Sequence, residues 1–231
     1  DLDNDGFDDL AIGAPGFDEG GRIDEGRVFV YYGSSSGPGA TPDVELTIGV
    51  GGAWFGANVA GAGDVDGDGD DDLIVGAVDY SNGELGEGGA FLFEGSETGV
   101  ATSPSWSFES DQPGAGLGWV TSTAGDVNGD GYADVLVGAD QFGADRSGEG
   151  RGWCFLGSAT GLATVPVWSI TGEQSGASLG GWGGDAGDVN GDGYDDIVLG
   201  ADTYDHDEFD EGRVFAYHGP LTETPSTDCP D

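Results

Sequence analysis

Acidic side chains recur in this chain at a spacing that can surround a metal ion. Four segments read Asp-x-Asp/Asn-x-Asp-Gly-x-x-Asp, and they begin at Asp1, Asp64, Asp126 and Asp188. Positions one, three, five and nine carry side-chain oxygens, and position seven adds a backbone carbonyl. Ca²⁺ takes about six to eight oxygen ligands from carboxylates, amides, carbonyls and water. The Gly at position six lets the chain reverse toward the ion. Each segment is therefore predicted to be a calcium loop.

The ligands follow from these positions, one set for each loop, so about four Ca²⁺ ions are expected. The side-chain ligands are Asp1, Asp3, Asp5 and Asp9; Asp64, Asp66, Asp68 and Asp72; Asp126, Asn128, Asp130 and Asp134; and Asp188, Asn190, Asp192 and Asp196. The position-seven carbonyls belong to Phe7, Asp70, Tyr132 and Tyr194. An EF-hand carries a bidentate Glu at position twelve. Here that position is Ile12, Val75, Val137 or Leu199, so these loops are of another kind.

Two other interpretations of the loops are weaker. Mg²⁺ fits less well, because it demands near-octahedral geometry and keeps its water. Asx-turns that carry solvated charge would explain one such loop. They do not explain four loops in register, because three or four carboxylates in each would repel one another at close range without a cation.

The charge of the chain excludes several classes of partner. Asp and Glu number 45 against 5 Lys and Arg, which gives a formal net charge of −40. Nucleic acid and anionic lipid surfaces both require basic patches, so neither is expected as a partner. Disorder would suit an acidic, Gly-rich chain. However, 36% of the residues are hydrophobic and 10% are aromatic, in short runs. No apolar run approaches the ~20 residues of a membrane helix.

The elements that position the loops recur with the same period. The loops begin 63, 62 and 62 residues apart, and aromatic segments such as RVFVYYG end at Gly33, Gly95, Gly157 and Gly219. Short apolar runs at 72–77 and 196–201 are typical of strands buried on both faces. Segments 28–32 and 214–218 are β-branched and aromatic. Segments 44–48, 105–109 and 167–171 alternate apolar with polar residues, as half-exposed strands do.

Four strands in each repeat predict an all-β fold, and the fixed period favours a β-propeller over a sandwich. The predicted blades are four-stranded and antiparallel, and there are about four of them. The repeats are expected at about 1–63, 64–125, 126–187 and 188–219, followed by a Pro/Thr-rich tail at 220–231.

The combination of Phe55-Gly56, the loop from Asp64 and the following LIVGA run resembles the FG-GAP repeat. That repeat forms the N-terminal propellers of integrin α-subunits and occurs in many secreted bacterial proteins. The resemblance covers nearly the whole chain. It implies a propeller with one calcium in the hairpin loop between the first two strands of a blade, used for adhesion or ligand binding. Two departures stand out: Leu-Gly replaces Phe-Gly at 117–118 and 179–180, and propellers of the family usually have seven blades.

Both ends of the repeat array are expected to be incomplete. The first repeat lacks the inner strand that normally precedes a loop, and the fourth lacks its outermost strand. Three explanations stay open: a fragment of a longer propeller, a four-bladed ring with imperfect closure, or a subunit completed by a neighbouring chain. The last follows from the tendency of an unpaired strand edge to template β-augmentation.

Aromatic and basic residues outside the loops receive structural assignments. The tryptophans are expected to pack between blades rather than to line a sugar- or peptide-binding face; they are Trp54, Trp106, Trp119, Trp153, Trp168 and Trp182. Arg22 and Arg146 lie in acidic loops, where they are expected to form local ion pairs of small energy.

His206 and His218 lack metal-ligand spacing and are expected at the surface. Cys154 and Cys229 lack CxxC spacing, and the sequence leaves open whether they pair within or between chains. No Ser, Cys or His forms a recognisable nucleophile–base pair, so an enzyme is not expected. Carboxylate pairs abound, so a calcium-bearing scaffold of a polysaccharide-degrading enzyme stays open as a third interpretation.

The sequence therefore predicts a secreted or cell-surface module that binds calcium for structural reasons and contacts a protein or glycan. The alternative is a structural subunit of an extracellular filament or surface layer, assembled by completion of strands or blades between subunits. Such a subunit would associate with itself. The ligand itself is not encoded in a recognisable motif, because fold does not fix function.

Overall fold

The computed structural model describes residues 1–221, and within them the chain is all-β, as predicted. Fourteen strands and no helix are present in this part of the chain. Their bounds are β1 Leu10–Ala14, β2 Arg27–Tyr31, β3 Val44–Leu46, β4 Phe55–Gly63, β5 Asp72–Ala77, β6 Gly89–Phe93, β7 Trp106–Glu109, β8 Leu117–Gly125, β9 Asp134–Ala139, β10 Arg151–Phe155, β11 Trp168–Thr171, β12 Leu179–Gly187, β13 Asp196–Ala201 and β14 Arg213–Tyr217. Among these residues no helix could cross a membrane.

The strands form four antiparallel sheets, each made of consecutive strands. The sheets are β1–β3, β4–β7, β8–β11 and β12–β14, so the two central sheets have four strands and the two outer sheets have three. Strand β5 is buried along its whole length, as its apolar run predicts, and so is β9. The run at 196–201, predicted in the same way, forms β13, in which Val198 and Gly200 are only half-buried. Within the described residues each outer sheet has one strand fewer than a central sheet.

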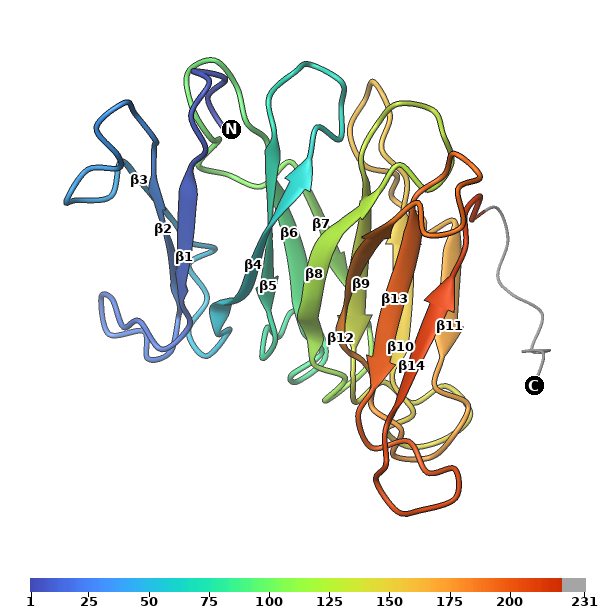
Figure 1. Ribbon diagram of the computed structural model, residues 1–231. Coiled ribbons are helices and arrows are strands. Elements are labelled where there is room, and N and C mark those ends of the chain that lie inside the picture. The colour runs from blue at the N-terminus through green and yellow to red at the C-terminus, as the bar shows by residue number, and fades with distance from the viewer. Residues whose placement is uncertain (222–231) are drawn as a thin grey trace.

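The sheets pack face to face in a row, and each contacts the next through its first strands. Figure 1 shows this row, from β1–β3 in blue to β12–β14 in orange and red. Three hydrophobic cores fill the spaces between successive sheets. The described residues form an open row, and no closed barrel is present. The antiparallel sheets of the predicted propeller are therefore confirmed, but ring closure stays a prediction.

Glycines allow neighbouring sheets to approach closely at the start of each first strand. A Cβ atom on Gly76 would lie 2.1 Å from the carbonyl oxygen of Gly118, and one on Gly138 would lie 2.3 Å from that of Gly180. Gly118 and Gly180 have positive φ angles of 110° and 87°. The Gly of each Leu-Gly pair is therefore required by its positive φ angle and by the close approach of the neighbouring sheet, whether Phe or Leu precedes it.

The two end faces of the row carry apolar side chains without a neighbouring sheet. Ile12 on β1 is 45% exposed, although its repeat counterparts Val75 and Val137 are fully buried. Val214 on β14 is 73% exposed, whereas its counterpart Val28 is fully buried. Each end face thus corresponds, residue by residue, to a face that is covered inside the row.

The six tryptophans divide into two groups. Trp106, Trp153 and Trp168 are at most 8% exposed and pack between sheets, as predicted. The other three contradict the prediction: Trp54, Trp119 and Trp182 are 39%, 44% and 71% exposed. All three lie within a few residues of the start of a first strand. Trp182 is exposed because it lies on the uncovered end face beside Arg213 and Val214, whereas its repeat counterpart Val120 is buried between the third and fourth sheets.

The cysteines are placed only in part. Cys154 lies in β10 and is fully buried in the core between the third and fourth sheets. Burial raises the pKa of its thiol well above the ordinary value. Cys229 and most of the predicted tail lie outside the described residues.

Candidate metal centres

The second, third and fourth predicted calcium loops each connect the first strand of a sheet to the second, and the first loop leads into β1. All four loops lie along the same edge of the stacked sheets. In Figure 1 this is the edge at which the N-terminus is marked. The order of strands therefore gathers the four acidic segments, which are about 62 residues apart in sequence, onto one edge of the molecule.

The Asp at position one shapes each loop by accepting hydrogen bonds from its backbone. In the third loop, Oδ1 of Asp126 accepts from the N–H groups of Gly129 and Asp130 at 2.7 and 3.0 Å, and Oδ2 accepts from Gly131 at 2.8 Å. Asp64 and Asp188 make the same three bonds in their loops. Such Asx-turn bonds wind the loop around the carboxylate that begins it.

The Asp at position nine closes the loop and attaches it to the sheet. Oδ2 of Asp72 accepts from the N–H of Val65 at 3.0 Å, and Oδ1 accepts from Gly95 at 2.9 Å, at the end of the third strand. Asp134 is bound in the same way by Val127 and Gly157. Both carboxylates are buried, so this position links metal loop, second strand and third strand.

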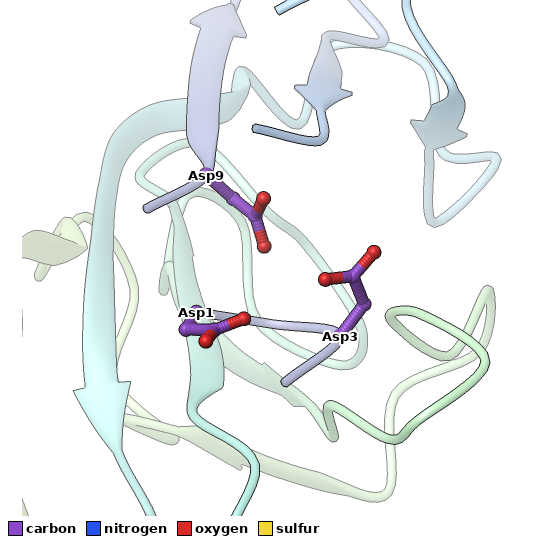
Figure 2. A group of neighbouring side chains, drawn as sticks. All are labelled: Asp1, Asp3 and Asp9. Carbon is purple, nitrogen blue, oxygen red and sulfur yellow. The ribbon is translucent and has the colours of Figure 1, made fainter. Parts of the chain in front are cut away.

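Carboxylates converge most clearly in the first two loops. Oxygens of Asp1, Asp3 and Asp9 lie within 4.8 Å of one another, and Figure 2 shows the three side chains turned toward a common space. In the second loop the converging oxygens belong to Asp64, Asp66 and Asp68. Their predicted partners Asp5 and Asp72 do not belong to these clusters.

The third and fourth loops have a different internal arrangement. The amide Nδ2 of Asn128 donates to Oδ2 of Asp130 at 2.9 Å, and the amide of Asn190 donates to Asp192 at 2.8 Å. The two Asn residues thus replace carboxylate repulsion with a hydrogen bond. At position seven, the N–H groups of Tyr132 and Tyr194 each donate to the position-five Asp. The predicted ligation by their carbonyls and by those of Phe7 and Asp70 stays a prediction.

The donor set fits a hard divalent cation. Oδ1 of Asp3 and Oδ1 of Asp70 are buried yet accept no hydrogen bond from the described residues. Burial, followed by the charge of neighbouring aspartates, raises the pKa of Asp3 and Asp70. Burial also raises the pKa of Asp72 and of Asp134 to about 7. Unpaired oxygens and carboxyls that resist ionisation are what a bound cation would satisfy.

His218 contacts the fourth loop, which the sequence did not predict. It is 53% exposed, as expected for a surface residue, but its Nδ1 lies 3.1 Å from Oδ2 of Asp196. Burial would raise the pKa of Asp196, but hydrogen bonds from His218, Gly219 and Val189 outweigh it and lower that pKa. The repeat counterparts of His218 are Leu156, Glu94 and Tyr32, so no shared pattern could have revealed this contact. His206 is 66% exposed, as predicted.

Neighbouring loops also contact one another, through residues at position eight that the sequence analysis did not single out. The N–H of Asp126 donates to Oδ2 of Asp195 at 2.8 Å, and the N–H of Asp195 donates back to the carbonyl of Asp126 at 3.2 Å. Asp1 and Asp71 form the corresponding pair between the first two loops. These bonds join residues about 70 positions apart, so only the stacking of sheets brings them together.

The edge of the stacked sheets opposite the metal loops contains a second repeated group. It is made of buried glutamates that lie just before β2, β6 and β10. Glu25, Glu87 and Glu149 are at most 1% exposed. Oε1 of Glu149 accepts from the N–H groups of Ala144 and Asp145 at 2.8 and 2.9 Å. These glutamates hold in place the loops that precede β2, β6 and β10.

The local arginine pairs predicted from sequence form with two of these glutamates. Arg22 binds Glu25, and Nη1 of Arg146 lies 3.6 Å from Oε2 of Glu149. The hydrogen bond from Arg22 lowers the pKa of Glu25. The sequence pattern Glu-Gly-Arg/Gly could have identified the glutamates, because it recurs with the same period as the loops.

Comparison with known proteins identifies the repeats. The model of the FG-GAP repeat matches residues 1–31, 117–153 and 180–217. Integrin alpha-5 of Xenopus laevis is 37% identical over 174 residues, which are 72% of this chain and 16% of the relative. Integrin alpha-4 of Xenopus laevis is 37% identical over 145 residues, or 60% of this chain and 13% of the relative.

An enzyme also shares the repeats. The phosphatidylinositol-glycan-specific phospholipase D of Mus musculus is 34% identical over 146 residues, which are 59% of this chain and 17% of the relative. The chain therefore spans less than a fifth of the length of each of these relatives.

Proposed function

We propose that this chain, which carries FG-GAP repeats like those of integrin alpha subunits, is an extracellular adhesion or binding module stabilised by about four Ca²⁺ ions. The observation that carries the proposal is that the four acidic loops lie along one edge of the stacked sheets. In the first loop the carboxylates of Asp1, Asp3 and Asp9 converge. The extracellular location is supported by the integrin relatives.

The role assigned to calcium is structural. Bound Ca²⁺ would supply positive charge to loops whose carboxylates otherwise repel one another. The buried carboxylates of Asp72 and Asp134 attach these loops to two strands each, so ordering a loop also fixes the end of its sheet. At about 100 times its dissociation constant, one ion stabilises the folded state by roughly 2.7 kcal/mol.

The ligand surface is assigned to the edge of the stacked sheets that lies opposite the metal loops. Trp54, Trp119 and Trp182 lie near the starts of β4, β8 and β12, far along those strands from the metal loops. Exposed indole rings offer large, rigid contact areas to proteins and sugars. Binding rather than catalysis is the proposed activity, with a protein or a glycan as the ligand.

Binding to a glycan array and to a panel of purified extracellular-matrix proteins, in Ca²⁺, tests this assignment. Trp119→Ala combined with Trp182→Ala should abolish any binding of the wild type without changing the thermal midpoint. The matched control is Val165→Ala, which removes a 71% exposed apolar side chain at the sheet edge that carries the metal loops. Absence of binding by the wild type, or equal binding by the tryptophan variant, would contradict the assignment.

A second candidate function is self-association into an extracellular assembly, and the uncovered end faces favour it. The face with Leu10 and Ile12 corresponds to faces that pack inside the row against the preceding sheet. The face with Val214 corresponds to faces that pack against the following sheet, and a hollow of about 460 Å³ lies beside Trp182 and Arg213. A second copy of the chain would join the two faces head to tail, which generates rings or filaments.

Two charged variants distinguish this head-to-tail contact from a symmetric one. Ile12→Asp and Val214→Asp each damage one face at an exposed position. Each variant alone should be monomeric by analytical ultracentrifugation, but an equimolar mixture should form a one-to-one dimer through the two intact faces. Association of either variant alone, a monomeric mixture, or a monomeric wild type would reject the second candidate.

A further inference from the structure

The third and fourth metal loops are joined by a reciprocal pair of hydrogen bonds across two sheets. The N–H of Asp126, which follows β8, donates to Oδ2 of Asp195 at 2.8 Å. The N–H of Asp195, which precedes β13, donates to the carbonyl of Asp126 at 3.2 Å. One of these bonds is accepted by the side chain of Asp195 and the other by the backbone of Asp126, so the contact depends on the side chain at only one of the two positions.

This pair lies directly between two predicted ligand sets. Asp126 is the first ligand of the third loop, and its carboxylate organises the N–H groups of Gly129, Asp130 and Gly131. Asp195 is bonded to Asp196, the last ligand of the fourth loop. The backbone position of a ligand in one loop therefore depends on the residue next to a ligand in the other.

The second and third loops provide an internal contrast, because Ala occupies the corresponding position eight. The N–H of Ala133 donates to the carbonyl of Asp64 at 2.9 Å, but Ala133 has no side-chain acceptor to return the bond. Both junctions have the space that the contact needs: Gly125 lies against Asp195, and its counterpart Gly63 lies against Ala133. The side chain at position eight is therefore the main difference between the two junctions.

We propose that Asp195 is a positioning residue that couples calcium binding in the fourth loop to calcium binding in the third. An ion that fixes Asp196 also fixes Asp195, and through it the backbone of Asp126, so the third loop is partly ordered before its own ion binds. The expected coupling is positive, although Coulomb repulsion between two ions acts in the opposite direction. This inference rests on the proposed calcium sites and adds a connection between them.

Occupancy of the two loops can be followed separately by amide NMR. The N–H of Gly131 donates to Asp126 and that of Gly193 donates to Asp188 at 2.9 Å, so each resonance reports the first ligand of its own loop. Calcium titrations of the whole chain, monitored at these two amides and at Gly69 in the second loop, give a dissociation constant for each site.

A double-mutant cycle measures the coupling. Asp192→Ala disables the fourth loop, and its effect on the calcium affinity of the third loop is compared in three backgrounds: wild type, Asp195→Ala and Asp195→Asn. We expect a loss of about fivefold or more in the wild type, the low end of typical coupling between sites. Asp195→Ala should remove this loss. Asp195→Asn keeps a side-chain acceptor without the charge, so it should retain most of the loss.

The possible results separate the two proposals. An equal effect of Asp192→Ala in the wild type and in Asp195→Ala, or no effect in either, would overturn the coupling while calcium binding itself persists. Failure of Asp195→Asn to retain the effect would assign it to charge alone and would also overturn it. If calcium shifts none of the three amide resonances in the wild type, both the calcium sites and their coupling are rejected. Asp195→Ala should fold, because Ala133 occupies the same position in the preceding loop.

Discussion

The carboxylate of Asp134 accepts a hydrogen bond from the backbone N–H of Gly157 at 2.9 Å, across 23 residues of sequence. Its other oxygen accepts from Val127 at 2.9 Å, and the side chain is fully buried. The position-nine Asp is therefore a structural residue of the sheet even without metal, in addition to its predicted role as a ligand.

Asp134→Ala should consequently destabilise the chain in chelator as well as in calcium. It leaves two buried N–H groups without an acceptor, which costs about 1–3 kcal/mol for each group. Asp130→Ala is the matched control, because Asp130 is exposed and holds only bonds within its own loop. Urea unfolding in EDTA measures the difference. Equal destabilisation by the two variants in EDTA would contradict the structural role.

Gly138→Ala should disrupt the contact between the third and fourth sheets. Its Cβ would lie 2.3 Å from the carbonyl oxygen of Gly180, so backbone must move, at a cost of about 3 kcal/mol. Gly200→Ala is the control at the same position of the last sheet, where the nearest atom is Cβ of Trp182 at 3.4 Å. Thermal unfolding should show a lower midpoint for Gly138→Ala and little change for Gly200→Ala. Similar midpoints for both would mean that the close approach is wrong.

Glu149→Ala should loosen the loop between β9 and β10. The N–H groups of Ala144 and Asp145 lose their acceptor, and an expected cost of about 2–3 kcal/mol follows. The control is Glu211→Ala, because the side chain of Glu211 is 33% exposed and accepts only the N–H of Asp207. Hydrogen exchange of residues 140–150 should accelerate in Glu149→Ala. Unchanged exchange would show that the glutamate does not hold this loop.

Cys154 offers a native probe of the calcium-dependent core. Its thiol is fully buried and its pKa is raised by burial, so alkylation requires the third and fourth sheets to open. Chelation should accelerate labelling of Cys154 by iodoacetamide by about tenfold or more, because the closed state loses the free energy of calcium binding. Peptide-resolved mass spectrometry separates this label from that of Cys229. Equal rates with and without calcium would contradict a metal-stabilised core.

The strands were predictable because their signals are local. Six consecutive apolar or small residues after Asp72 indicate a strand covered on both faces, and β5 is buried throughout. The period of the loops placed all four acidic segments in equivalent positions of the repeat, and the structure gathers them at one edge. A gapless internal repeat fixes such equivalences without knowledge of the tertiary structure.

The rest depends on contacts between residues far apart in sequence. Composition could not separate buried Trp168 from exposed Trp182, because the difference is whether a neighbouring sheet covers the side chain: Trp168 packs in the core of the last two sheets, and Trp182 lies on the uncovered end face. The pairing of Asp126 with Asp195 likewise arises only when the last two sheets stack. The repeat pattern left open whether the array is a fragment, an imperfectly closed ring or a subunit completed by a neighbouring chain, because local strand signals do not set the angle between sheets.

Calcium stoichiometry is the most direct test of the central claim, that metal ions neutralise the four acidic loops and thereby stabilise the row of sheets. Native mass spectrometry of the purified chain, with thermal unfolding in calcium and in EDTA, measures both halves of the claim. The account predicts about four Ca²⁺ per chain and a clearly lower thermal midpoint after chelation. A chain that binds no calcium, or that unfolds at the same temperature in EDTA, would contradict it.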